Sequence, residues 1–153
     1  MNRLTKLKNL FVKYHIDGYI VPKNDEFFGE YIDKKVDRLN FISSFSGSSG
    51  QALILRKRAY IFVDGRYTLQ AKREVNKNFK VIEIHKIKPS KILRNIKKRL
   101  KIGFDPKLFS ELDLSNKFKE KNITLIPIND NLIDKIWLKK QKVKISKFFI
   151  LNS

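Results

Sequence analysis

The sequence predicts a single α/β domain in which helices flank a mixed six-stranded sheet. Three observations lead to this fold class. About six short apolar segments alternate along the chain with amphipathic, helix-like segments. Two of the apolar segments, residues 51–55 and 59–63, are separated by only three residues, so they pair antiparallel and the sheet is not purely parallel. Finally, a chain of 153 residues with 42% hydrophobic content can bury one real core.

The elements of the N-terminal half follow from the spacing of apolar residues. Leu4, Leu7 and Leu10 recur at helical intervals among lysines, which is typical of an amphipathic surface helix. Pro22 cannot donate a hydrogen bond to a sheet, so it ends the first strand. In chain order we expect a helix over 2–15, a strand over 19–22, a polar loop over 23–35, a short helix over 36–45, and hairpin strands over 51–55 and 59–63.

Capping residues mark the elements of the C-terminal half. Asp64 can accept hydrogen bonds from the free amides at the start of a helix. Ser110 with Asp113 resembles a capping box, and Asn131 is a preferred helix cap. In chain order we expect a helix over 67–75, a strand over 81–84, a helix from Pro89 or Ser90 to about Leu100, a strand over 101–104, a helix over 110–118, a strand over 123–128, and a last helix from Asn131 to Trp137.

These elements place one domain over residues 1–137. Residues 138–153 are interpreted as a linker or as the start of a missing following domain, because they lack a helical stripe and end on an unclosed apolar run. The absence of cysteine excludes a disulfide framework and a thiolate nucleophile, and it fits a reducing cytoplasm. The sequence holds no continuous apolar run of the kind that a secretory signal or a membrane span needs. We therefore expect a cytoplasmic protein with no membrane partner.

The formal net charge of +19 permits two interpretations, a nucleic-acid partner or a lysine-rich, solvated surface. The densest basic block, residues 86–101, also carries Ile92, Leu93, Ile96 and Leu100 on one helical stripe, so its lysines fall largely on the opposite, wet face. Basic residues occur in nearly every other segment as well. We therefore favour the solvated surface and keep nucleic-acid binding as the alternative.

The glycine-rich stretch 45–50, FSGSSG, permits three interpretations. A phosphate-binding loop needs Gly-Lys-Ser/Thr at the start of a helix, whereas the residues after Gly50 open a strand. A nucleophile elbow needs Gly-x-Ser-x-Gly between a strand and a helix, and both the spacing and the element order differ here. What remains is a tight turn whose small residues allow a close approach of the backbone.

Chemistry-bearing residues form no catalytic constellation in the sequence. His15 and His85 are far apart, and neither has a partner at helical spacing or a nearby pair of carboxylates. Each is interpreted as a surface or strand-end residue. The 15 Asp and Glu residues show no metal-ligand spacing, and no histidine suits a serine-hydrolase triad. We expect no catalytic residue, no metal ligand and no cofactor in this chain.

Six motifs, however, follow one another in a distinctive order. They are GYIVP, DEFFGEY, DRLNFISSFSGSSGQALI, FVDGRYTLQA, IGFDPKLFS and NLIDKIW. Together they resemble the N-terminal domain of the Xaa-Pro aminopeptidases (aminopeptidase P), the creatinase N-terminal domain, from about Asp17 to Trp137. The sequence departs from the family at several positions. Phe27 and Phe41 stand where histidine and tryptophan are usual, Ser43-Ser44 replaces Thr-Gly, and Leu138-Lys139-Lys140 replaces a proline-rich linker.

The resemblance implies a domain that does not itself catalyse. In the family, a C-terminal pita-bread domain with two divalent metals, usually manganese, removes an N-terminal residue that precedes proline. That domain is expected to be the partner of this one, in cis or as a separate chain, and the peptide substrate is expected only in the full-length enzyme. A homo-oligomer is also compatible with the resemblance.

Arg66 is the one residue of the DGRY motif with a candidate functional role. Gly65 is expected to permit a sharp strand-to-helix turn, Asp64 to cap amides, and Tyr67 to pack with a wet hydroxyl. From the residues alone, Arg66 equally well forms an ion pair with Asp64 or with another surface carboxylate. The resemblance implies instead that the DGRY arginine reaches toward the peptide substrate, where its donor fork can hold a carboxylate or a carbonyl.

Three hypotheses follow for the function. The first is the non-catalytic N-terminal domain of an Xaa-Pro aminopeptidase-like protein, as a fragment or a truncated product that contributes substrate contact and assembly. The second is a basic nucleic-acid-binding module, and against it we see no exposed aromatic-rich strand of the kind that stacks on bases. The third is a stand-alone assembly domain.

Overall fold

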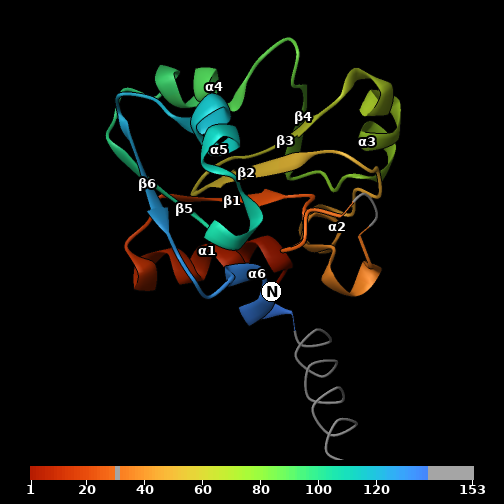
Figure 1. The fold of residues 1–153 in the computed structure, drawn as a ribbon, viewed down its shortest axis with the longest axis horizontal. Helices are drawn as coiled ribbons and strands as arrows, with labels where there is room; N and C mark the ends of the chain where they lie inside the picture. The colour runs from red at the N-terminus through yellow and green to blue at the C-terminus, as the bar shows by residue number, and fades with distance from the viewer. Residues whose placement is uncertain (30–31, 138–153) are drawn as a thin grey trace, which may run out of the picture.

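The computed structural model describes residues 1–29 and 32–137. Its centre is a six-stranded sheet with the order β4-β3-β2-β1-β5-β6 (Figure 1). Strands β1, β2 and β3 are buried along their whole length, as expected for strands covered on both faces. The strands are β1 (Gly18–Pro22), β2 (Gln51–Leu55), β3 (Ala59–Val63), β4 (Phe79–Glu83), β5 (Leu100–Phe104) and β6 (Ile123–Pro127).

The sheet is mixed, as the sequence predicts. β2 runs antiparallel to both of its neighbours, β1 and β3, and the β2–β3 hairpin pairs Gln51 with Phe62 and Ile54 with Ala59. The remaining pairs, β1–β5, β3–β4 and β5–β6, are parallel. The parallel strands all end at one edge of the sheet, and the loops that follow them meet there.

Helices cover both faces of the sheet and complete three layers (Figure 1). On one face, α1, α2, α6 and Ala71 of α3 contribute to a core that includes Leu7, Phe11 and Leu39. On the other face, Leu93 of α4 and Phe118 of α5 pack in a second core cluster. The helices are α1 (Arg3–Tyr14), α2 (Arg38–Ser43), α3 (Thr68–Glu74), α4 (Pro89–Asn95), α5 (Glu111–Phe118) and α6 (Leu132–Ile136), with short 3₁₀ helices η1 (Lys34–Val36), η2 (Gly65–Tyr67) and η3 (Pro106–Leu108).

The helix predicted to run to about Leu100 ends five residues earlier, at Asn95. The prediction placed Ile96 and Leu100 on one helical stripe, but Ile96 has an extended backbone, and Leu100 begins β5 and pairs with Ile123 of β6. The amide of Asn122 donates to the carbonyl oxygens of Leu93, Ile96 and Lys98, at 2.9, 2.8 and 3.0 Å. These three bonds draw the chain out of the helix and into the sheet.

Other boundaries differ by a few residues. β4 begins at Phe79 rather than at residue 81, because Asn76 turns the chain by accepting the amide of Asn78 with its side chain. The helix predicted over 67–75 is a 3₁₀ turn followed by α3, and the one predicted over 36–45 is η1 followed by α2.

A buried polar network fastens α6 to the rest of the domain. The guanidinium of Arg38 in α2 binds the carboxylate of Asp134 in two contacts, Nε to Oδ1 at 2.8 Å and Nη2 to Oδ2 at 3.0 Å. Asn131 caps α6 by accepting the amides of Ile133 and Asp134, and its own amide donates to Asp105 Oδ2 at 2.9 Å. Burial raises the pKa of the Tyr19 hydroxyl, which accepts a hydrogen bond from the amide that opens α6.

No helix in the part of the chain that the structure describes is long and apolar enough to cross a membrane. The predicted linker over residues 138–153 lies outside the described residues. The last described residue, Trp137, stacks on Phe41 of α2 with ring centroids 4.6 Å apart. The guanidinium of Arg3 also lies over the Phe41 ring, 4.1 Å from the ring centroid. Phe41 therefore packs well at a position where a larger aromatic residue is usual in the family.

Candidate functional site

The DGRY motif forms a strand-to-helix corner between β3 and α3. Asp64 follows the last residue of β3, and its Oδ1 accepts the backbone amide of Arg66 at 2.9 Å, so the predicted capping role is confirmed. This hydrogen bond is the main reason why the pKa of Asp64 is lowered, with smaller contributions from the side chains of Arg66 and His85. The role predicted for Gly65 is wrong, because no described glycine has a positive φ and a Cβ on Gly65 would meet open space. The 3₁₀ turn η2 makes the corner instead.

Arg66 presents its guanidinium to solvent from this corner. Its side chain is 75% exposed, and its Nε lies 3.2 Å from Asp64 Oδ1. The guanidinium carbon lies 5.4 Å from the centroid of the Tyr67 ring. Among the described residues, neither terminal nitrogen of Arg66 has a hydrogen-bond partner. Asp64 therefore holds the inner edge of the guanidinium and leaves its outer fork, the part suited to a carboxylate or a carbonyl, unused.

The glycine-rich stretch 45–50 is scaffold, as the sequence predicts. A Cβ on Gly47 would lie 2.1 Å from the ring of Phe45, so the turn needs glycine for a close approach. The amide and hydroxyl of Ser46 both donate to Glu74 of α3 at 2.7 Å, and Gln70 donates to the same carboxylate at 2.8 Å. Partial burial acts to raise the pKa of Glu74, but these hydrogen bonds outweigh it and the pKa is lowered. A carboxylate thus already occupies the amide and the hydroxyl of Ser46.

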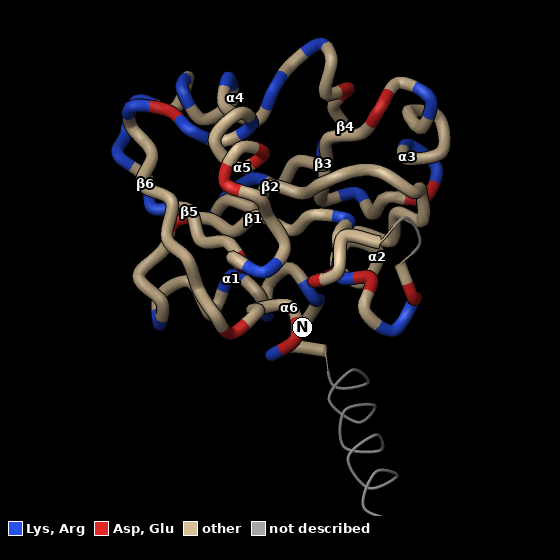
Figure 2. Tube along the Cα trace, viewed as in Figure 1, with Lys and Arg blue, Asp and Glu red and all other residues tan. Residues whose placement is uncertain are grey.

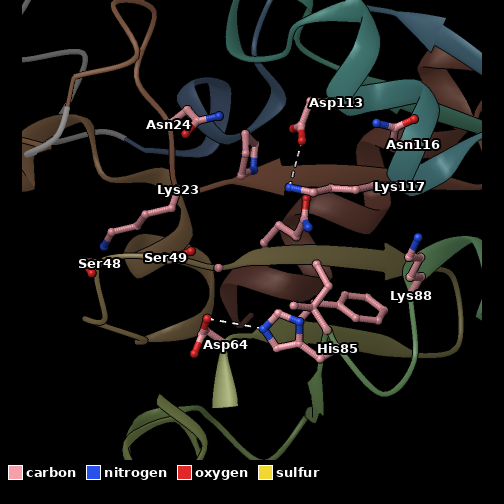
Figure 3. A pocket seen from close by; sticks show the side chains of 15 residues that line it. Lys23, Asn24, Ser48, Ser49, Asp64, His85, Lys88, Asp113, Asn116 and Lys117 are labelled. Atoms are coloured by element: carbon pink, nitrogen blue, oxygen red, sulfur yellow. Dashed lines mark ion pairs between the residues drawn. The ribbon is translucent and has the colours of Figure 1, made fainter. Parts of the chain in front are cut away.

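A cleft of about 540 Å³ lies next to the corner, at the edge where the parallel strands end (Figure 3). Five segments line it: the loop after β1, the serines before β2, the end of β3, the loop after β4, and α5. In Figure 3, His85 faces Asp64 and Lys117 faces Asp113, with nitrogen–oxygen distances of 3.5 and 3.0 Å. Open α/β sheets bind ligands at this edge. Arg66 is not among the lining residues.

The two histidines lie apart in the structure, as their sequence separation suggests. His15 is exposed and ends α1 in a left-handed conformation with φ of 55°. His85 is exposed after β4, as predicted for a strand-end residue, although Asp64 is a carboxylate partner that the sequence does not reveal. Within residues 1–29 and 32–137, no group of three or more His, Asp or Glu side chains could hold a metal ion. The described residues therefore do not fit a dimetal centre.

The chain matches a known protein family over nearly all of its described residues. The family profile of the creatinase/prolidase N-terminal domain matches residues 3–136. The chain belongs to this family. Its single α/β domain with a six-stranded mixed sheet is the fold of that family, so the resemblance inferred from the ordered motifs is confirmed.

Relatives and solved structures show which larger proteins contain such a domain. A probable Xaa-Pro aminopeptidase P of Laccaria bicolor is 32% identical over 142 residues, which cover 88% of this chain and 22% of that protein. Xaa-Pro aminopeptidase 2 of Rattus norvegicus is 35% identical, with 88% and 21% covered. The crystal structure of an X-prolyl aminopeptidase from Caenorhabditis elegans, a cytosolic enzyme with a dinuclear active site, superposes with a TM-score of 0.80 at 27% identity over 90% of this chain and 25% of that one. The chain thus spans about a fifth to a quarter of the length of these relatives.

Sequence reasoning identified the corner but missed the cleft. DGRY is a contiguous motif, so its residues can be recognised together. The cleft is lined by five separate segments that lie between residues 22 and 117. No local sequence pattern indicates that Asn24 and Asn116 line the same cleft. Turn signals after β1, β3 and β4 were the available clue, because the loops after parallel strands gather at one edge of a sheet.

Proposed function

We propose that this chain is the non-catalytic N-terminal domain of an Xaa-Pro aminopeptidase-like metallopeptidase. The observation that carries the proposal is the family match over nearly the whole described chain, in relatives where the matched part is only about 22% of the protein. The partner is a catalytic domain in cis or in a separate chain, and the reaction is removal of an N-terminal residue that precedes proline. The absence of cysteine and the cytosolic relative from Caenorhabditis elegans support a cytoplasmic location.

Arg66 is the residue that we assign to substrate contact. It stands at a corner where Asp64 accepts hydrogen bonds from its backbone amide and from the Nε of its side chain. Its outer fork is open to solvent and can donate two parallel hydrogen bonds to a peptide carboxylate or carbonyl. The catalytic domain supplies the metals and the attacking water, and this domain supplies one wall of the substrate site.

The first test is activity of the isolated chain. Purified protein supplied with manganese is expected to release no first residue from an X-Pro peptide, measured by mass spectrometry of the products. A chimera in which residues 1–137 replace the N-terminal domain of Xaa-Pro aminopeptidase 1 of Dictyostelium discoideum, a 34% identical relative, is expected to cleave the same peptide. Cleavage by the isolated chain, or a folded and metal-loaded chimera without activity, would contradict the proposal.

A further inference from the structure

One edge of the sheet, opposite to the cleft, gathers positive charge from several loops. Three hollows adjoin along it, and they share lining residues such as Ile96, Lys57 and Lys80. Their walls hold two cations from the β2–β3 turn, Lys57 and Arg58; two near the start of β4; four from residues 94–99; and Lys121 before β6. All nine are exposed. We call this surface the basic edge.

Folding adds cations from distant segments to the dense basic block that contains Arg94, Lys97, Lys98 and Arg99. Parallel strands β4, β5 and β6 all begin at the same edge, and the turn between β2 and β3 lies there too, so four loops that are distant in the chain come together. Of the residues that the structure describes, nine Lys and Arg side chains and one carboxylate, that of Glu120, line the hollows. Figure 2 shows part of the edge at the upper left, where the segments leading into β5 and β6 are mainly blue. Basic residues are scattered along the sequence, which favoured a solvated surface. In the folded chain, nine of the described ones gather at this edge.

The charge on the basic edge is largely uncompensated, and one of its four segments is fixed by hydrogen bonds. Among the described residues, the only ion pair of the nine cations is a long one of 3.9 Å between Arg94 and Glu120. The amide of Asn122 binds three carbonyl oxygens of the segment 93–98, which fixes the loop that presents Lys97 and Lys98. Folding thus brings like charges together without partners, an arrangement that favours an anionic ligand.

We propose that the basic edge binds the phosphate backbone of duplex nucleic acid without sequence preference. A continuous row of hollows lined by cations matches a ligand with a charge at every step, since duplex DNA carries one negative charge per about 1.7 Å of its axis. The aromatic residues of the edge, Tyr60 and Phe79, are only 6% and 7% exposed, so they offer no platform for the stacked bases of a single strand. Among the described residues, the large exposed apolar ones, such as Phe27 and Leu112, do not line the hollows, so this part of the edge offers no side chain that would enter a membrane.

The test is fluorescence anisotropy of labelled, mixed-sequence duplex DNA and duplex RNA over a range of salt concentrations. The edge variant carries Lys97→Ala, Lys98→Ala and Arg99→Ala. The matched control carries Lys6→Ala, Lys72→Ala and Lys107→Ala, which removes the same charge from exposed positions outside the hollows. Both keep residues 138–153. The edge variant is expected to reduce the slope of log K against log salt by about 3, since each phosphate contact contributes about 0.9. The control is expected to keep the wild-type slope.

Three results would overturn the proposal. The first is no binding of either duplex by the wild-type chain at low salt. The second is an equal loss in the two triple variants, which would mean diffuse charge and no site. The third is binding of polyglutamate or of anionic vesicles in preference to the duplex. Circular dichroism and a melting curve check the fold of each variant, and if the edge variant does not fold, single Lys97→Ala and Lys98→Ala variants are expected to reduce the slope by about 1 each.

Discussion

Two arginine–aspartate pairs of this domain have the same chemistry and opposite surroundings. Arg38 and Asp134 join α2 to α6 across 96 residues of sequence through two hydrogen bonds, and the Arg38 side chain is only 4% exposed. Arg66 and Asp64 are two residues apart and share one side-chain contact, with Arg66 75% exposed. The residues of the first pair are distant in sequence and come into contact only when the chain folds. Those of the second pair are near neighbours in sequence and come into contact whenever the corner forms.

Burial decides what each arginine can do. Burial acts to lower the pKa of Arg38, but the bonds to Asp134 outweigh it and the pKa is raised, so this cation stays charged and fixed. Its Nη1 is buried without a hydrogen-bond partner among the described residues, so Arg38 has a desolvation cost that Asp134 must offset. Arg66 has no such cost and keeps its outer fork in water. The buried pair can stabilise the fold, and the exposed one is available for a ligand.

The largest expected effect is that of Arg38→Ala, which leaves Asp134 without its main cationic partner in a partly buried site. Breaking a buried ion pair costs about 3–5 kcal/mol. We therefore expect the free energy of unfolding of the chain, measured by urea denaturation, to fall by about that amount. A loss well under 1 kcal/mol would mean that the pair is as dispensable as a surface pair, and the comparison between the two arginines would fail.

The helix caps allow a smaller version of the same comparison. Asn131 is buried and Ser110 is exposed, and each accepts a hydrogen bond from the first turn of its helix. Loss of a cap costs about 1 kcal/mol, and Asn131→Ala also leaves a buried oxygen of Asp105 without its donor, at a further cost of about 1–3 kcal/mol. The free energy of unfolding, measured by urea denaturation, should therefore be lower for Asn131→Ala than for Ser110→Ala by at least about 1 kcal/mol. Equal values for the two variants would contradict this ranking.

A still smaller effect on stability is expected at Glu74, whose burial is intermediate between that of Arg38 and that of Arg66. Its pKa is lowered in the folded state, so its contribution to stability is fully present above the ordinary glutamate pKa and is lost as the pH falls through the lowered value. Below about pH 4.5, the melting temperature of the Glu74→Gln variant should therefore fall less steeply with pH than that of the wild type. The same acid dependence in both proteins would show that Ser46 and Gln70 do not stabilise the charged form.

The fold was predictable from the sequence wherever the controlling residues are neighbours. The hairpin follows from a three-residue turn, and the caps at Asp64 and Asn131 follow from residue type. The end of α4 was not predictable, because it depends on Asn122, which lies 26 residues beyond Ile96. The Arg38–Asp134 pair, the cleft and the basic edge likewise join segments that meet only in the folded chain. The role of Arg66 came from the ordered motifs and stays a prediction.

The measurement that tests the central claim most directly is the steady-state kinetics of Arg66→Ala in the active chimera, with Arg73→Ala, an exposed arginine of α3, as the matched control. Loss of a hydrogen bond to a charged group weakens binding by about tenfold or more. We expect Arg66→Ala to raise KM for an X-Pro peptide by about that factor, with kcat, bound metal and melting temperature unchanged, and Arg73→Ala to match the parent chimera. An unchanged KM, or a melting temperature well below that of the parent, would show that Arg66 is only the partner of Asp64 and that this domain does not contact the substrate through it.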